Sequence, residues 1–96
     1  PPQINLLGQF LGTALTSICR KNEIAVSLVG TVQDVRDLIA YRLDFGVPAD
    51  EVPSLATGWR AEIVGNIIEK LLAGELSLRI EDPKAAAPLV FESASE

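Results

Sequence analysis

One glycine-bracketed apolar segment, residues 57–74, constrains the fold of this chain more than any other. Its apolar residues recur three and four positions apart, which is the spacing of one helical face. Glycines stand at both ends, and Gly74 is a natural C-terminal stop. We therefore predict a helix over residues 59–73 that buries a broad stripe against other helices. The stripe consists of Ile63, Val64, Ile67, Ile68, Leu71 and Leu72.

Two further helices supply the surface that this stripe needs. The first is predicted over residues 4–21, where apolar residues again follow helical spacing. The second is predicted over residues 31–43, because Thr31 and Asp34 approximate a capping box at its start. The apolar run between them, residues 24–29, fits either a short helical turn or an extended connector.

Gly8 and Gly12 lie four residues apart on one side of the first predicted helix. This spacing marks helix association only in membranes. Here it favours close packing by a neighbouring helix, or simple tolerance of glycine, over an association motif.

The pattern changes after Gly74. Residues 76–80 alternate apolar and polar side chains, as in an edge strand or an extended arm. Because one strand without a partner is not a sheet, we predict an arm. Residues 81–96 contain prolines and an alanine run, and we predict a flexible acidic tail with a small apolar anchor at residues 89–91. The predicted architecture is an all-α compact helical bundle over residues 1–80, with three main helices, one or two short ones and a C-terminal extended arm.

The charge balance argues against a strong, non-specific grip on nucleic acid. Eight basic and thirteen acidic residues give a net charge of −5, whereas such a grip comes mainly from neutralising phosphates. The acidity is uneven, because residues 1–80 contain seven basic and nine acidic side chains. Any contact with a polynucleotide is therefore expected to be local and weak.

The residue types present leave little room for catalysis. The chain has no histidine, so imidazole-based triads are excluded within it, and its one cysteine, Cys19, cannot form an internal disulfide or a usual zinc site. We expect Cys19 to be a buried small hydrophobe. The glycines form no phosphate-binding fingerprint. We predict no catalytic residue, no metal and no cofactor.

No secretory signal is visible in the sequence, and its apolar runs are far shorter than the roughly 20 residues that cross a bilayer. We therefore expect a cytoplasmic protein without a membrane partner. Because it begins at Pro1 and contains no methionine, we interpret it as part of a longer protein.

Trp59 beside Arg60 allows two interpretations. In the functional one, an exposed indole stacks on a base or sugar while the guanidinium binds a phosphate, as on single strands. In the structural one, Trp59 anchors the turn in the core, and Arg60 pairs with an acidic neighbour or caps a preceding carbonyl.

The same segment resembles a known family. Residues 55–65 read LATGWRAEIVG and residues 71–76 read LLAGEL, which is similar to the C-terminal part of ribonuclease D-related proteins. That part resembles the HRDC domain, a helical module shared by ribonuclease D and RecQ-type helicases. The resemblance covers about residues 4–80.

The resemblance implies an accessory module, not itself an enzyme, that helps position RNA or single-stranded DNA for a 3′–5′ exonuclease or helicase parent. Its backbone contacts would come from Arg36, Arg42, Arg60 and Lys70, with Trp59 stacking. The acidic charge departs from the basic face of family members that bind nucleic acid well. The alternative is a module that packs on its parent catalytic domain or forms a homodimer without touching nucleic acid.

Overall fold

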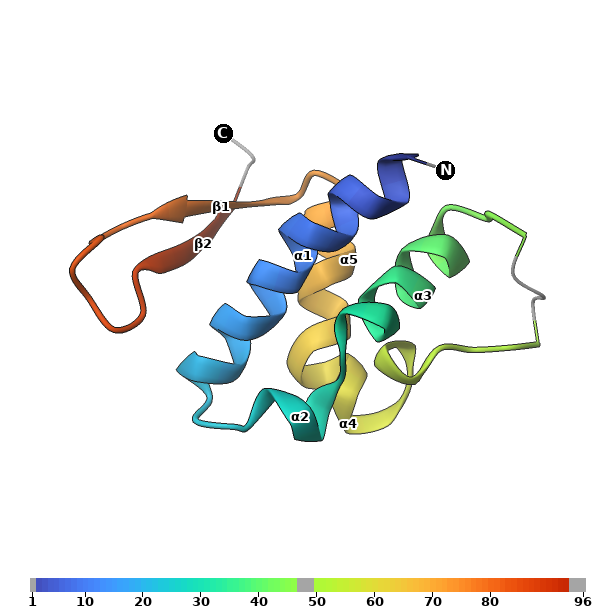
Figure 1. The fold of residues 1–96 in the computed structure, drawn as a ribbon, viewed down its shortest axis with the longest axis horizontal. Coiled ribbons are helices and arrows are strands. Elements are labelled where there is room, and N and C mark those ends of the chain that lie inside the picture. Colours follow the sequence, from blue (N-terminus) through green and yellow to red (C-terminus); the bar gives the residue numbers. More distant parts are fainter. Residues whose placement is uncertain (1, 47–49, 94–96) are drawn as a thin grey trace.

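The helical body is built from two long helices and one interrupted helix that share a core (Figure 1). The computed structural model describes residues 2–46 and 50–93. The described chain is mostly helical, as predicted, but it also contains two strands. In chain order the elements are α1 (Pro2–Lys21), α2 (Val26–Val29), α3 (Val32–Arg42), η1 (Ser54–Ala56), α4 (Gly58–Arg60), η2 (Ala61–Gly65), α5 (Asn66–Leu72), β1 (Leu76–Ile80) and β2 (Leu89–Ser93).

α1 and α3 pack closely because glycines on α1 face α3. A methyl group at Gly8 would lie 3.1 Å from Cγ of Arg36, and one at Gly12 would lie 3.6 Å from Cγ2 of Val32. The prediction of close packing at these glycines is confirmed. Burial of apolar side chains from the helices other than α4 then drives the assembly. The buried core comprises Leu11, Leu15, Ile18, Cys19, Val29, Val35, Leu38, Ile39, Leu55, Val64 and Ile68.

The start of α3 has the predicted capping box. The Thr31 hydroxyl accepts a hydrogen bond from the Asp34 backbone N–H at 3.2 Å, and the Asp34 carboxylate accepts one from the Thr31 backbone N–H at 2.7 Å. Both bonds satisfy backbone donors that a helix start otherwise leaves open. α2, just before it, is a single helical turn, so the helical alternative for residues 24–29 is confirmed.

The last predicted helix runs without a break through α4, η2 and α5, but η2 is π-helical. At its end, Gly65 touches the turn η1. A methyl group on Gly65 would overlap the backbone carbonyl oxygen of Leu55, whose side chain is fully buried. Only glycine permits this approach, because it has no Cβ. Gly74, with φ +77°, ends the helix as predicted.

The C-terminal segment differs from the prediction. β1 pairs antiparallel with β2, so Leu76–Ile80 is not an unpartnered arm and residues 81–93 are not a free tail. Residues 94–96 lie outside the described part of the chain. The hairpin projects from one side of the helical body (Figure 1).

The hairpin forms because it has an apolar face. Leu78 lies opposite Phe91, and Ile80 lies opposite Leu89. Directly opposed residues point to the same face of a sheet. Phe91 packs against the core, which holds the hairpin onto the helices. Near the hairpin turn, Arg20 Nη1 donates a 2.8 Å hydrogen bond to the Ala86 carbonyl oxygen.

We predict that Gly65→Ala destabilises the protein by about 3 kcal/mol or more, because the new methyl group meets backbone rather than a movable side chain. Gly12→Ala is the matched control. Its methyl group would make an ordinary contact with Val32, and alanine favours a helix by about 1 kcal/mol over glycine. Urea denaturation measures both. Equal stability of the two variants would contradict the close contact at Gly65.

Candidate nucleic-acid interface

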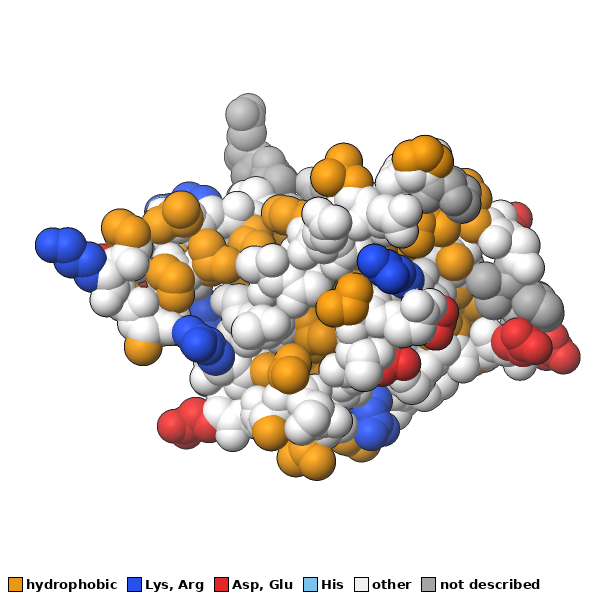
Figure 2. Space-filling view, viewed as in Figure 1, with side chains coloured by type: hydrophobic (Ala, Val, Ile, Leu, Met, Phe, Trp, Pro, Cys, Tyr) orange, Lys and Arg blue, Asp and Glu red, His pale blue; other side chains and the backbone are white. Residues whose placement is uncertain are grey.

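The five candidate contact residues lie in three separate places. Trp59 and Arg60 begin the last helix, Arg36 faces α1, and Arg42 and Lys70 lie at the other end of the bundle on α3 and α5. Figure 2 shows Lys and Arg side chains dispersed over one face of the molecule, separated by neutral and acidic groups. The structure therefore does not bring the five residues together into one basic surface.

Arg60 ties α2 to the last helix. Its Nε donates to the Val29 carbonyl oxygen at 3.0 Å, and its Nη2 donates to the Leu28 carbonyl oxygen at 3.2 Å. The last carbonyls of a helix lack partners within the helix, so a guanidinium there satisfies acceptors and favours the negative end of the dipole. The interpretation of Arg60 as a cap of preceding carbonyls is confirmed.

Trp59 is 44% exposed, so its interpretation as a core anchor is wrong. Instead the Arg60 guanidinium carbon lies 4.4 Å from the centre of the indole ring, as in a cation–π contact. Arg60 is fixed by the α2 carbonyls, and it holds the indole at the surface. The exposed indole keeps π surface on which a base can stack.

Arg36 acts mainly through its stem. The stem covers Gly8 on α1, and its Nε is buried without a hydrogen-bond partner. No acidic side chain of the described residues forms an ion pair with it. Arg36 thus contributes packing and an uncompensated positive charge at the junction of α1 and α3.

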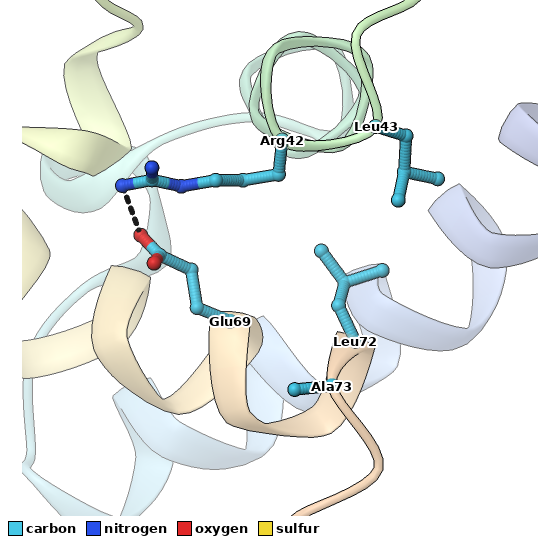
Figure 3. Close-up of a pocket in the computed structure, with 5 residues that line it drawn as sticks. All are labelled: Arg42, Leu43, Glu69, Leu72 and Ala73. Atoms are coloured by element: carbon cyan, nitrogen blue, oxygen red, sulfur yellow. Dashed lines mark hydrogen bonds and ion pairs between the residues drawn. The ribbon is translucent and has the colours of Figure 1, made fainter.

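Arg42 reaches across a hollow between α3 and α5 (Figure 3). Its Nη2 lies 2.8 Å from Oε2 of Glu69. Beside this ion pair, the side chains of Leu43 and Leu72 point toward one another. Together with Ala73 these four residues line a hollow of about 270 Å³.

A second hollow lies beside α5. It has a volume of about 430 Å³ and shares Glu69 and Ala73 with the first. Residues three, four and seven positions apart lie on one face of a helix, which explains why this face of α5 lines the hollow. The lining consists of Asn66, Glu69, Lys70, Ala73 and Glu75. We call the two hollows together the α3–α5 groove.

The groove combines an apolar part with charges of both signs. Lys70 is exposed and forms no ion pair within the part of the chain that the structure describes. Arg42 is 42% exposed and uses one nitrogen on Glu69. A phosphate can therefore approach either cation, while a sugar or base lies over Leu43 and Leu72.

Several other cations are occupied within the protein. Arg79 Nε lies 2.7 Å from Oε2 of Glu92, and this hydrogen bond lowers the pKa of the Glu92 carboxyl below its usual value. Lys21 lies over the Phe91 ring, with Nζ 5.8 Å from the ring centre. Arg20 is held by the hairpin. Contacts within the protein thus leave fewer of its positive charges open to a ligand.

Cys19 offers no reactive thiol. Its side chain is 2% exposed, and burial raises the pKa of the thiol above its usual value, so the thiolate is disfavoured at neutral pH. The prediction of a buried small hydrophobe is confirmed. Within residues 2–46 and 50–93, no group of three or more Cys, Asp or Glu side chains is placed to hold a metal ion.

Sequence reasoning missed the partner of Arg42. Glu69 lies 27 positions away, and an exposed glutamate on a helix carries no signal of what faces it. Leu72 was assigned to the buried stripe of the last helix, and nothing in the sequence indicated that it lines a hollow with Leu43. Their convergence depends on the angle between α3 and α5, which no local pattern encodes.

Comparison with protein families, curated proteins and solved structures finds no match to this chain. The resemblance to ribonuclease D-related proteins and to the HRDC domain therefore stays a prediction from the sequence. Among the described residues, none of the helices has the length and apolar character to span a bilayer.

We predict that Arg60→Met destabilises the protein by about 1–2 kcal/mol, because the variant keeps the stem but loses two hydrogen bonds from a charged donor. Lys70→Met is the control and should change stability by less than about 0.5 kcal/mol, since Lys70 has no ion pair to lose. Thermal denaturation followed by circular dichroism gives both values. An Arg60→Met protein as stable as the wild type would show that the link to α2 contributes little.

Proposed function

We propose that this domain is an accessory module that holds single-stranded RNA or DNA weakly for a ribonuclease D-like exonuclease or helicase parent, and that it works in the cytoplasm. The observation that carries the proposal is the α3–α5 groove, in which Arg42 lines the hollow with Leu43 and Leu72, and Lys70 lines the second hollow, which shares Glu69 and Ala73 with it. This combination suits a single nucleic-acid strand, because phosphates bind cations and bases pack on apolar or aromatic side chains.

The small number of cations in the groove predicts weak binding. Binding strength and its salt dependence grow with the number of phosphates that a protein neutralises. The groove offers two cations, and one of them is already paired with Glu69. A surface of net charge −5 also repels a polyanion at longer range. Such a module adds modest affinity that becomes useful when a parent domain holds the same strand.

Trp59 and Arg60 form a separate, secondary contact in this proposal. The indole is exposed, and the guanidinium beneath it is held in place by Leu28 and Val29. The α2 carbonyls use one N–H each of Arg60 Nε and Nη2, so both N–H groups of Nη1 and one of Nη2 remain as donors. We therefore assign stacking to Trp59 and a smaller role in phosphate binding to Arg60 than to Arg42 and Lys70.

We predict that replacing Arg42 and Lys70 together by glutamine weakens binding of a labelled ten-nucleotide oligo(U) RNA by about tenfold at 50 mM NaCl, because two phosphate contacts are lost. Fluorescence anisotropy gives the dissociation constants, and the slope of log K against log salt should fall by about one to two.

Lys84→Gln is the control for this experiment. Lys84 lies in the hairpin turn, outside the groove, and its replacement should leave affinity within about twofold of the wild type. Equal effects of Lys84→Gln and of either groove substitution, or no salt-sensitive binding by the wild type, would refute nucleic-acid binding through the groove.

A second candidate function is protein docking, onto the parent catalytic domain or a second copy of the chain. It is favoured by two large apolar side chains on α1, Leu6 at 69% and Phe10 at 45% exposure. They lie four residues apart and so share one face of the helix. Neighbouring apolar residues on a surface are a feature of interaction sites.

If docking between copies is the function, the sedimentation coefficient of the wild type should rise with concentration between about 10 and 500 μM, the range of weak protein association. Replacing Leu6 and Phe10 by glutamine should abolish the rise, because both side chains are exposed and their polar replacement leaves the core intact. A concentration-independent monomer would argue against self-association.

A further inference from the structure

Glu69 occupies the centre of the α3–α5 groove, where the proposed function calls for positive charge. It lines both hollows, precedes Lys70 in the sequence and contacts Arg42 Nη2 at 2.8 Å. Its side chain is 30% exposed, so a ligand in the groove meets its carboxylate directly.

We infer that Glu69 limits the affinity of the groove for phosphodiester backbones by neutralising Arg42. This inference rests on the proposed function, because it assigns the specificity-determining residue of that site. In the absence of a strand, Glu69 occupies the position on Arg42 that a phosphate oxygen would take. A bound phosphate must either displace this carboxylate or lie beside it at the cost of repulsion.

The geometry favours such an exchange. Arg42 contacts Glu69 through one nitrogen rather than by a bidentate pair, which leaves other guanidinium N–H groups for a ligand. Its guanidinium carbon also lies 5.1 Å from the centre of the Tyr41 ring, a contact that uses none of these N–H groups. A phosphate offers several oxygens and can bind the guanidinium through two parallel hydrogen bonds. Exposed ion pairs contribute little to stability, so the Arg42–Glu69 contact can open without disturbing the fold.

The other acidic residue of the groove does not act in this way. Glu75 lines only the second hollow and forms no ion pair among the described residues. Glu69 is therefore the carboxylate that controls Arg42, whereas Glu75 contributes general repulsion.

The test compares Glu69→Gln with Glu62→Gln in binding the same oligo(U) RNA by fluorescence anisotropy at 50 and 200 mM NaCl. Both variants remove one negative charge from the same continuous helix. Glu62 is exposed and forms no ion pair in the described residues. Each substitution is also made in an Arg42→Gln background, and circular dichroism verifies that every variant is folded.

We expect Glu69→Gln to tighten binding by about three- to tenfold and to steepen the salt dependence by about one phosphate contact. Glu62→Gln should tighten binding by less than about twofold, since its charge is further from the groove. In the Arg42→Gln background the two substitutions should have the same small effect, because no cation remains to be released.

Two results overturn the inference alone. In the first, wild-type binding depends on Arg42 and Lys70 but Glu69→Gln leaves the affinity unchanged. In the second, the gain in affinity from Glu69→Gln persists in the Arg42→Gln background. Absence of binding by both the wild type and Glu69→Gln overturns the inference together with the proposed function. Arg42-dependent binding that appears only in Glu69→Gln supports the inference and refutes nucleic-acid binding by the natural chain.

Discussion

The contact between Gly65 and the Leu55 carbonyl determines how the last helix meets the rest of the molecule. Leu55 is buried and belongs to η1. Because Gly65 has no side chain, η1 lies directly against the last helix. Interiors are packed as tightly as organic crystals and transmit displacements. A shift at this contact would therefore move α5 relative to α3 and change the groove in which Arg42 meets Glu69.

Local signals in the sequence predicted most of the helical body. Thr31 and Asp34 lie three positions apart, so their capping box depends on local residues alone. Gly8 and Gly12 indicate close packing by another element, whichever element that is. The hairpin could not be predicted in the same way. Residues 76–80 carry a strand pattern, but their partner begins nine positions after Ile80 and has only three consecutive apolar residues. Pairing depends on packing of Phe91 against a core that forms elsewhere.

The candidate site was less predictable than the fold. Arg42 and Lys70 were identified as cations, and the structure places both beside one groove, yet the same reasoning grouped them with Arg36 and Arg60. Those two arginines face α1 and α2 and have structural contacts there. Charge type is visible in a sequence, whereas the distinction between a cation used internally and one open to a ligand depends on tertiary contacts.

The π-helical winding of η2 has a consequence for how this chain tolerates changes in length. A π segment contains one residue more than the α-helical turn that it replaces, so the residues before it are rotated by about 100° relative to an uninterrupted α-helix. Winding the same residues as a regular α-helix would turn Arg60 away from the carbonyls of α2, whereas deletion of a single residue before Gly65 would let the helix wind regularly and keep Arg60 facing them. Homologous chains that lack one residue in this segment should therefore keep the contact between Arg60 and α2, and larger changes in length should accumulate in the connection before η1 or in the hairpin turn.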